Sequence, residues 1–205
     1  MTVARRALVF DFDGVLADTE PLIWQAWTGL LAPHNIDFTW DDYCRLGRGA
    51  TDEQMLARLP AVQSDPDLLA RLNAAIDTRR QIVRDACRDR SPIPAATASM
   101  LRQLHDFSLG LVTSSSRDEA ELVLRNAGVL SCFHAMVCAE DCARHKPDPE
   151  PYLFIRDRLG IDTAFAFEDS DVGLASAAAA GFTAIRVPDP QHLPDVVAAA
   201  LRIGR

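Results

Sequence analysis

Short runs of consecutive apolar residues alternate with longer amphipathic stretches over most of the chain. The apolar runs have the length and composition of buried strands and lie at 6–13, 109–114, 133–139, 163–170 and 183–188. Apolar residues at helical spacing fill the stretches 96–107, 117–128, 148–160, 171–181 and 194–203. Apolar strands that alternate with helices are typical of a parallel sheet covered on both faces. We therefore predict an α/β fold with a doubly wound parallel sheet.

The part of the chain between the first and second predicted strands differs, because it contains no strand pattern. The predicted helices there cover 22–36, two short segments on either side of Gly47–Gly49, and 65–90. The last of these stops at the proline-containing "SPIP" segment, 91–94. We therefore predict a core domain formed by 1–17 and 92–205, with an α-helical cap domain inserted at 18–91. The tryptophans expected in the core of this cap are Trp24, Trp27 and Trp40.

Composition and charge narrow the functional classes. The chain has 205 residues, of which 48% are apolar, with a net charge of −8 and a pI near 5.0. An acidic chain with scattered basic residues argues against nucleic acid or an anionic membrane as the main partner. No apolar run reaches the ~20 residues of a membrane span. The start, "MTVARRALVFDF", reaches charged residues too early for a signal peptide. We expect a cytoplasmic monomer that binds neither nucleic acid nor membranes.

The five cysteines are irregularly spaced, at Cys44, Cys87, Cys132, Cys138 and Cys142. A zinc site would require four ligands, and His145 is the one further ligand type near Cys138 and Cys142. We therefore expect free thiols in a reducing compartment, which agrees with a cytoplasmic location.

Polar side chains that can support catalysis follow each of the first four predicted strands. They are Asp11 and Asp13, then Thr113, Ser114 and Ser115, then Lys146, and last Glu168 and Asp169. The carboxyl ends of parallel strands meet at one crevice, so these groups should converge there. Four carboxylates in one place need a cation, and oxygen ligands without His or Cys suit Mg²⁺, which also bridges to phosphate. The pattern therefore indicates a metal-assisted phosphoryl-transfer site.

Each of these residues also has a simpler structural explanation. Asp11 and Asp13 could belong to a turn, and Thr113 could serve only as a strand residue. Lys146 could be a solvated surface lysine, and Glu168–Asp169 could be a helix N-cap pair. The occurrence of all four groups at strand ends favours the catalytic interpretation.

Four short motifs follow one another in the order found in a known enzyme superfamily. They are "DFDGVLADT" from Asp11, Thr113 in "LVTSSSR", Lys146 in "HKPDPEPY", and "FEDSDVGLASAAAAG" with Glu168 and Asp169. On these motifs the chain resembles the haloacid dehalogenase superfamily. More narrowly, it resembles the branch of sugar-phosphate phosphatases and β-phosphoglucomutase-like enzymes with a small helical cap. The resemblance covers nearly the whole chain and implies an α/β core with an inserted cap.

The resemblance implies roles for four core residues. Asp11 matches the nucleophile that forms an aspartyl-phosphate. Asp13 matches the general acid and base, which protonates the leaving alkoxide and then activates water. Thr113 and Lys146 match the groups that hold the phosphoryl oxygens.

The resemblance also implies Mg²⁺ as the cofactor. The expected ligands are a carboxylate oxygen of Asp11, the backbone carbonyl of Asp13 and the carboxylate of Asp169. Glu168 would bind the metal directly or through water. The metal would neutralise charge on the transferring group.

Substrate contacts are expected from both domains. Ser114 and Ser115 are expected near the phosphate. The specificity of the cap is expected to depend on Glu20, Arg48 and the stretch 79–84. A single sequence does not identify the phosphorylated metabolite.

Several residues of this chain differ from those that other reactions of the superfamily require, which limits the reactions that we expect. Asp13 argues against haloacid dehalogenation, which needs no acid to protonate an alkoxide, and the lack of lysine in 18–91 argues against phosphonate hydrolysis through a Schiff base. A β-phosphoglucomutase-type mutase usually has a histidine where this chain has Ile23, and a basic cap residue near Thr51 or Asp52. We predict a Mg²⁺-dependent phosphomonoesterase for a small sugar or polyol phosphate. The alternatives are a hexose-phosphate mutase and, less favoured, a non-catalytic phosphometabolite-binding protein.

Overall fold

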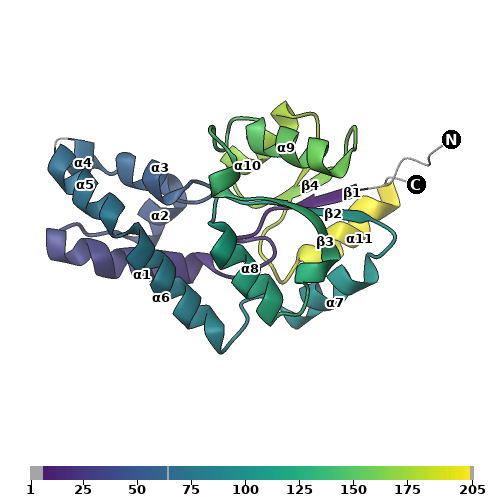
Figure 1. Cartoon of the computed structure of the whole chain (residues 1–205), viewed down its shortest axis with the longest axis horizontal. Helices are drawn as coiled ribbons and strands as arrows, with labels where there is room; N and C mark the ends of the chain where they lie inside the picture. The colour runs from purple at the N-terminus through teal and green to yellow at the C-terminus, as the bar shows by residue number, and fades with distance from the viewer. Residues whose placement is uncertain (1–6, 64, 204–205) are drawn as a thin grey trace.

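The computed structural model describes residues 7–63 and 65–203, so the predicted start of the core, 1–6, lies outside the described residues. The described residues form a sheet of parallel strands: β1 (Ala7–Phe10), β2 (Ser108–Val112), β3 (Phe133–Val137), β4 (Phe165–Glu168) and β5 (Thr183–Arg186). The strand order is β3-β2-β1-β4-β5, which puts β1 in the middle of the sheet (Figure 1). The prediction of an α/β fold with a parallel sheet is confirmed.

Helices cover both faces of this sheet. They are α7 (Ala95–Gln103), α8 (Arg117–Asn126), α9 (Glu150–Leu159), α10 (Asp171–Ala179) and α11 (Leu193–Ile203). Val9 of β1 is buried with Ile155 on the face covered by α9 and α10, whereas Leu8 is buried with Leu101 on the face covered by α7, α8 and α11. Successive side chains of a strand point to opposite faces, so both faces require apolar residues. None of the helices within the described residues is long and apolar enough to cross a membrane.

Between β1 and β2, the described residues form helices and no strand. These are α1 (Glu20–Leu31), η1 (Ala32–His34), α2 (Trp40–Leu46), α3 (Asp52–Ala57), α4 (Pro60–Gln63), α5 (Pro66–Ala74), α6 (Ile76–Arg88) and then α7 of the core. Two further short 3₁₀ helices, η2 (Leu130–Cys132) and η3 (Ala139–Asp141), flank β3. In Figure 1 the helices α1–α6 form a separate group beside the sheet, on the left, and α6 contacts α8. The domain boundaries stay a prediction.

The helical stretch predicted over 65–90 consists of two helices in the structure, with a break at Ala75 that was not predicted. Leu68 and Leu72 give α5 an apolar side, and α5 packs against α3 inside the cap. The next helix, α6, packs against α1 and against α8 of the core. The chain must therefore change direction at Ala75, and helical periodicity alone does not indicate such a change. The short helix α4 was also not predicted.

The tryptophans of the cap differ in their burial. Trp27 is fully buried, and Trp24 packs against the same core and donates from Nε1 to the carbonyl of Phe38 at 3.0 Å. Trp40 is 37% exposed, and its ring stacks on Tyr43. The prediction that all three tryptophans lie in the cap core is therefore wrong for Trp40, which covers Tyr43 from the outside.

Candidate active site

The turn after β1 places two aspartates at the carboxyl edge of the sheet. The backbone N–H of Asp11 donates to the carbonyl of Phe167 at 2.9 Å, which extends the pairing between β1 and β4. Gly14 follows with a φ of 73°, and a Cβ at this position would collide with the Asp169 carboxylate. This glycine therefore lets the turn with Asp11 and Asp13 approach the acids that follow β4.

Lys146 lies between carboxylates of the first and fourth strands. Its Nζ is 2.9 Å from Asp11 Oδ1 and 2.7 Å from Glu168 Oε1, and it donates to the carbonyl of Val112 at 3.2 Å. The lysine is 1% exposed, so it is not a solvated surface lysine. Burial alone would lower the pKa of Lys146, but the carboxylates of Asp11 and Glu168 outweigh burial and raise it above its ordinary value. Lys146 is therefore charged and compensates part of the negative charge around it.

Three buried acids form a compact cluster. Carboxylate oxygens of Asp11, Glu168 and Asp169 lie within 4.8 Å of one another. Burial, followed by the charge of Asp11, raises the pKa of Glu168 to about 8 and that of Asp169 to about 6. Glu168 Oε1 accepts from the Tyr152 hydroxyl at 2.6 Å, whereas Glu168 Oε2 and Asp169 Oδ1 have no hydrogen-bond partner within the described part of the chain. Buried carboxylate oxygens without donors are costly, so the cluster fits a divalent cation that takes oxygen ligands.

Hydroxyl groups hold the carboxylate of Asp13. Thr19 Oγ1 donates to Oδ1, and Ser115 Oγ donates to Oδ2 at 2.6 Å. Burial raises the pKa of Asp13 by more than these two hydrogen bonds lower it, and the charge of Asp11 adds to the increase. The Asp13 side chain does not belong to the acid cluster, so its expected metal contact through the backbone carbonyl stays a prediction.

The turn after β2 contributes hydroxyl groups to two sides of the site. Thr113 Oγ1 accepts from the backbone N–H of Ser115 at 2.9 Å, which fixes the turn from which Ser115 reaches Asp13. Ser114 points to the cap instead, and its Oγ donates to the carbonyl of Gly49 at 2.9 Å. Ser114 and Ser115 therefore both line the cavity with Asp11 and Asp13, and Ser114 also joins the core to the cap, whereas Thr113 holds the turn.

Two residues of the site were missed at the level of sequence. Thr19, which holds Asp13, closes the "DFDGVLADT" motif, so the motif itself contained the signal. Tyr152, which holds Glu168, belongs to α9, and its position depends on how that helix packs against the sheet. Only its place in "HKPDPEPY" could have drawn attention to it.

Two predicted cap residues meet the core at Asp169. Arg48 Nε is 2.7 Å from Asp169 Oδ2 and 2.9 Å from Glu20 Oε2. Burial, followed by the charge of Asp169, raises the pKa of the buried Glu20 to about 9. Glu20 also lines the cavity over Asp13, whereas Arg48 is engaged at the edge of the acid cluster. The role of Arg48 and Glu20 in binding substrate stays a prediction.

A cavity with a volume of about 30 Å³ lies between the cap and the core. The residues that line it include Asp11, Asp13 and Ser115 of the core and Glu20, Ile23, Thr51, Asp52 and Arg79 of the cap. A cavity needs about 10–15 Å³ to hold one water molecule, so this cavity is too small for a sugar. The cap and the core lie close together over Asp13, and movement of the cap to admit a larger ligand stays a prediction.

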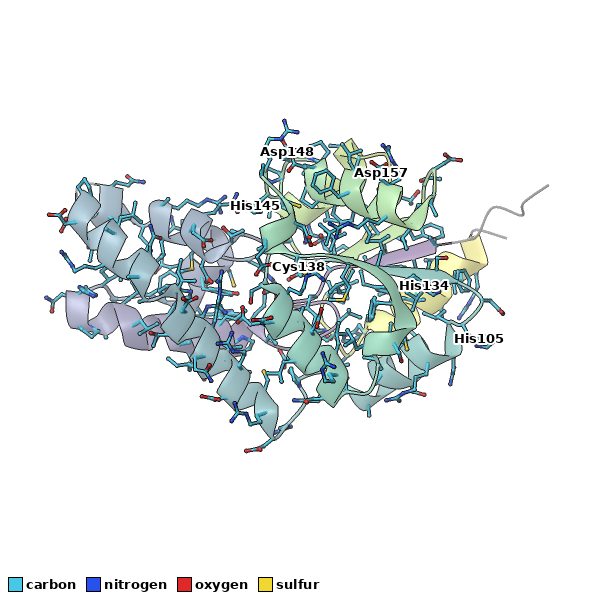
Figure 2. The ribbon with its side chains drawn as sticks, viewed as in Figure 1. His105, His134, Cys138, His145, Asp148 and Asp157 are labelled. Atoms are coloured by element: carbon cyan, nitrogen blue, oxygen red, sulfur yellow. The ribbon has the colours of Figure 1, made fainter. Side chains whose placement is uncertain are left out.

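The cysteines and histidines do not gather into a second metal centre. Among the described residues, Asp11, Glu168 and Asp169 are the one group of three or more possible metal ligands that lie close enough together to share an ion. The five cysteines have free thiols. The zinc alternative at Cys138, Cys142 and His145 therefore has no support. Figure 2 shows His105 and His134 on the side of the sheet away from the cap, far from His145.

Comparison with known proteins identifies relatives over most of the chain. The family described as haloacid dehalogenase-like hydrolase matches residues 8–187. The chain is 30% identical over 185 residues to the fructose-1-phosphate phosphatase YqaB of Escherichia coli (strain K12), which covers 88% of this chain and 95% of that protein. It is 29% identical over 181 residues to a phosphorylated carbohydrates phosphatase of Thermotoga maritima, with 87% and 83% covered.

The fold is also found among solved structures. The crystal structure of β-phosphoglucomutase from Clostridium difficile is similar with a TM-score of 0.77 and covers 96% of this chain and 99% of that chain. The two sequences are 19% identical, so this similarity concerns the fold alone.

Proposed function

Because the chain belongs to the haloacid dehalogenase-like hydrolase family, we propose that it is a Mg²⁺-dependent phosphomonoesterase for small sugar or polyol phosphates. The phosphoryl group passes from the ester to Asp11 and then to water. One observation carries this proposal. Asp11 lies between the charged Lys146 and the buried acids Glu168 and Asp169, and Asp13 follows two residues later.

Asp11 is the proposed nucleophile. One of its carboxylate oxygens forms a bond to phosphorus while the bond between phosphorus and the leaving alcohol oxygen breaks. Lys146, 2.9 Å from Asp11, offsets the negative charge that the aspartate and the incoming phosphoryl group share. The hydroxyl of Thr113, which accepts from the Ser115 N–H, is a further candidate to hold a phosphoryl oxygen.

Asp13 is the proposed general acid and base. Burial raises the pKa of Asp13, which favours the protonated carboxyl group that gives its proton to the leaving alkoxide. The carboxylate that results can then take a proton from the water that attacks the aspartyl-phosphate. Ser115 and Thr19 hold the carboxyl group in one orientation through both steps.

The acid cluster is the proposed magnesium site. Asp11, Asp169 and Glu168 supply carboxylate oxygens, and two of the oxygens, Glu168 Oε2 and Asp169 Oδ1, have no hydrogen-bond partner in the described residues. When bound, Mg²⁺ would offset charge on the transferring phosphoryl group. Lys146 and Tyr152 keep Glu168 oriented toward the cluster through Oε1.

The substrate class rests on the relatives and on the size of the site. The names of two relatives refer to fructose 1-phosphate and to phosphorylated carbohydrates. The cap lies over Asp13 and lines the cavity together with the core, so a substrate has to fit between the two, which favours small esters over phosphoproteins. We further expect the enzyme to act as a cytoplasmic monomer on a small phosphorylated metabolite.

The proposal favours hydrolysis over the mutase alternative. Ile23 lines the cavity twelve residues after Asp11, and its apolar side chain cannot hold a hydroxyl group. A mutase must keep its aspartyl-phosphate from water until the second half of the reaction. With Asp13 beside the nucleophile and no polar group at Ile23, we expect water to intercept the intermediate.

A metabolite panel tests this function. The purified protein with Mg²⁺ should release inorganic phosphate from sugar or polyol phosphates, and excess chelator should stop the release reversibly while the circular dichroism spectrum stays folded. Asp11→Asn should lower turnover by about 10³-fold or more, as loss of a catalytic group that acts in a unit does. Full activity in chelator, unchanged turnover of Asp11→Asn, or isomerisation of a hexose phosphate without phosphate release would contradict the proposal.

A further inference from the structure

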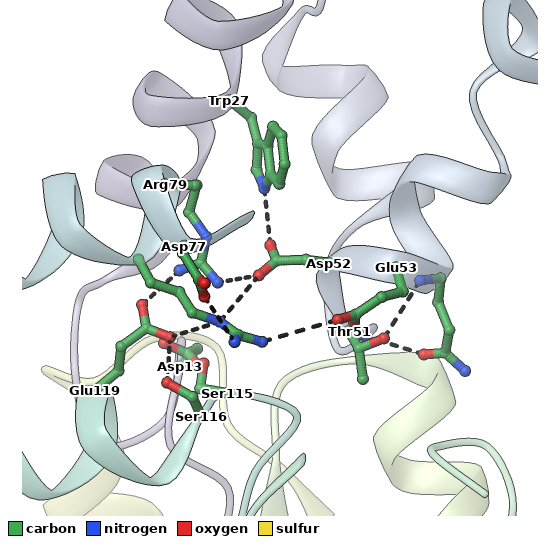
Figure 3. Close-up of polar contacts among 12 residues, drawn as sticks. Asp13, Trp27, Thr51, Asp52, Glu53, Asp77, Arg79, Ser115, Ser116 and Glu119 are labelled. Carbon is green, nitrogen blue, oxygen red and sulfur yellow. Dashed lines mark hydrogen bonds and ion pairs between the residues drawn. The ribbon is translucent and has the colours of Figure 1, made fainter. Parts of the chain in front are cut away.

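A buried ion-pair network joins the cap to the core beside the cavity over Asp13 (Figure 3). Arg79 of α6 is 3% exposed; its Nη1 donates to Glu119 Oε1 of α8 at 2.5 Å, and its Nη2 donates to Asp52 of α3. Trp27 Nε1 donates to the other carboxylate oxygen of Asp52 at 2.8 Å. The proposed chemistry uses none of these groups, yet Arg79 and Asp52 both line the cavity.

Arg79 and Asp52 have hydrogen-bonding capacity left. A guanidinium group has five N–H donors, and the two carboxylates account for one N–H on each Nη of Arg79. The Nε of Arg79 is buried and has no hydrogen-bond partner in the described part of the chain. A carboxylate has about four lone-pair sites, and Asp52 uses two of them, for Trp27 and Arg79. Donors and acceptors side by side suit an alcohol hydroxyl, which donates one hydrogen bond and accepts others.

The network has no excess positive charge that a second anionic group could use. Two carboxylates, Asp52 and Glu119, share Arg79, and the second positive charge comes from Arg80, whose Nε is 3.9 Å from each carboxylate. The remaining acidic side chain that the cap contributes to the cavity is Glu20, and it adds no positive charge. An anionic group on the leaving alcohol would therefore lose hydration without a net attraction to replace it.

We propose that Arg79 and Asp52 are specificity-determining residues that bind hydroxyl groups of the leaving alcohol. Arg79 donates to alcohol oxygens, and Asp52 accepts from hydroxyl protons. The pair directs the enzyme to monophosphate esters of neutral polyhydroxy compounds and disfavours alcohols that carry a carboxylate or a second phosphate. This inference rests on the proposed function and names the part of the substrate that the cap recognises.

Glu119 is a positioning residue, because it acts through Arg79. Its Oε2 accepts from the Ser116 hydroxyl at 2.8 Å, and its Oε1 accepts from Arg79. The core helix α8 therefore sets the direction of a cap side chain. Since Arg79 and Glu119 belong to opposite sides of the boundary between cap and core, the hydroxyl-binding pair is complete only when the cap is closed.

Two matched pairs of esters test the selectivity of the unmodified enzyme with Mg²⁺. Fructose 1-phosphate is compared with fructose 1,6-bisphosphate, and glucose 6-phosphate with 6-phosphogluconate. In each pair, kcat/KM for the neutral alcohol should exceed that for the anionic one by about tenfold or more, the size expected for a lost polar contact in a closed site. p-Nitrophenyl phosphate has a leaving group without alcohol hydroxyl groups. Its hydrolysis therefore measures phosphoryl transfer in the absence of the proposed hydroxyl contacts.

Two variants and a control separate recognition from stability. Arg79→Lys keeps the charge and loses the planar fork, so kcat/KM for the neutral esters should fall about tenfold more than kcat/KM for p-nitrophenyl phosphate, mainly through KM. Asp52→Asn leaves Arg79 with less compensated charge, so the preference for neutral over anionic esters should shrink about tenfold. Arg88→Gln substitutes an exposed side chain of the same helix, so it should not change the ratios of kcat/KM between the esters. Thermal unfolding of each variant verifies that it is folded.

Three results would overturn the inference. They are a wild-type preference for the anionic esters, an equal loss on p-nitrophenyl phosphate and on the neutral esters in Arg79→Lys, and an unchanged ester preference in folded Asp52→Asn. Hydrolysis of p-nitrophenyl phosphate that depends on Asp11, without discrimination within the ester pairs, would refute this inference alone. A wild-type protein that releases phosphate from no ester would refute the proposed function as well.

Discussion

At the scale of single residues, the site depends on how buried charges compensate one another. Lys146 contacts two carboxylates, and removing it would leave Asp11 and Glu168 buried without their shared cation. Lys146→Met keeps most of the volume, so the expected loss is electrostatic. The free energy of unfolding, measured in urea without metal, should fall by about 3 kcal/mol, as when one partner of a buried ion pair is removed.

The matched control for this prediction is Arg144→Met, two residues earlier in the chain. Arg144 is paired with Asp148 and Glu150 at an exposed position. We expect its substitution to leave the urea midpoint nearly unchanged, because exposed ion pairs contribute little. If the two variants lost equal stability, Lys146 would not hold the acid cluster together.

The core of the site could be predicted from the sequence because each group follows a strand in a short motif. Once the strands are parallel and β1 is central, Asp11, Lys146 and Asp169 must meet. The contact between Arg79 and Asp52 could not be predicted in the same way. These two residues come from different helices, and their distance depends on how the helices pack rather than on any local pattern.

At the scale of elements, the loop between α2 and α3 connects the cap to the site. Gly49 has a φ of 72°, its carbonyl accepts from Ser114 Oγ, and a Cβ there would collide with the Ser170 hydroxyl. Gly49→Ala should therefore cost about 1–3 kcal/mol of stability through backbone strain. It should also lower kcat/KM for sugar phosphates, because the loop can no longer approach the core.

Gly29→Ala provides a control for the substitution itself. Gly29 lies inside α1, and a Cβ there meets nothing within 4 Å. Alanine should raise the stability of this helix position by about 0.5–1 kcal/mol and leave kcat/KM unchanged. Urea unfolding and steady-state kinetics measure the stability and kcat/KM of both variants. Equal effects of Gly49→Ala and Gly29→Ala on these two quantities would contradict the role of the Gly49 loop.

The elements themselves were predicted where a local signal existed. Strands that are apolar throughout and helices that end at Gly160 were visible in the sequence, and the structure has Gly160 as a left-handed C-cap of α9. The break at Ala75 was not visible, because neither Gly nor Pro marks it. The exposure of Trp40 was not visible either, since an aromatic residue at helical spacing does not reveal whether a further layer covers it.

At the scale of the whole molecule, the closed site concentrates acids whose pKa values burial raises. Glu20 is raised to about 9, Glu168 to about 8 and Asp169 to about 6. Between the ordinary carboxyl pKa and these values, the folded protein holds protons that the unfolded chain has released. Without metal, the free energy of unfolding should therefore fall as pH rises from 5 to about 9.

Chemical unfolding in chelator across this pH range checks the sign. Glu20→Gln should make the decline shallower, whereas Glu53→Gln, a substitution of a more exposed acid of α3, should not. Mg²⁺ should stabilise the protein more at higher pH, because it binds the ionised acids of the folded state. Stability that rises with pH in chelator would contradict the buried-acid account.

The central claim is that the phosphoryl group passes through Asp11 and that Asp13 governs its release. p-Nitrophenyl phosphate has a leaving group that needs no proton, so Asp13→Asn should still phosphorylate Asp11 but fail to activate water. Rapid mixing of Asp13→Asn with this ester and Mg²⁺ should give a burst of about one nitrophenolate per enzyme. Mass spectrometry after acid quench should find one phosphoryl group on the peptide that contains Asp11. A phosphoryl group on another residue, or an equal burst when Asp11→Asn is added to this variant, would contradict the account.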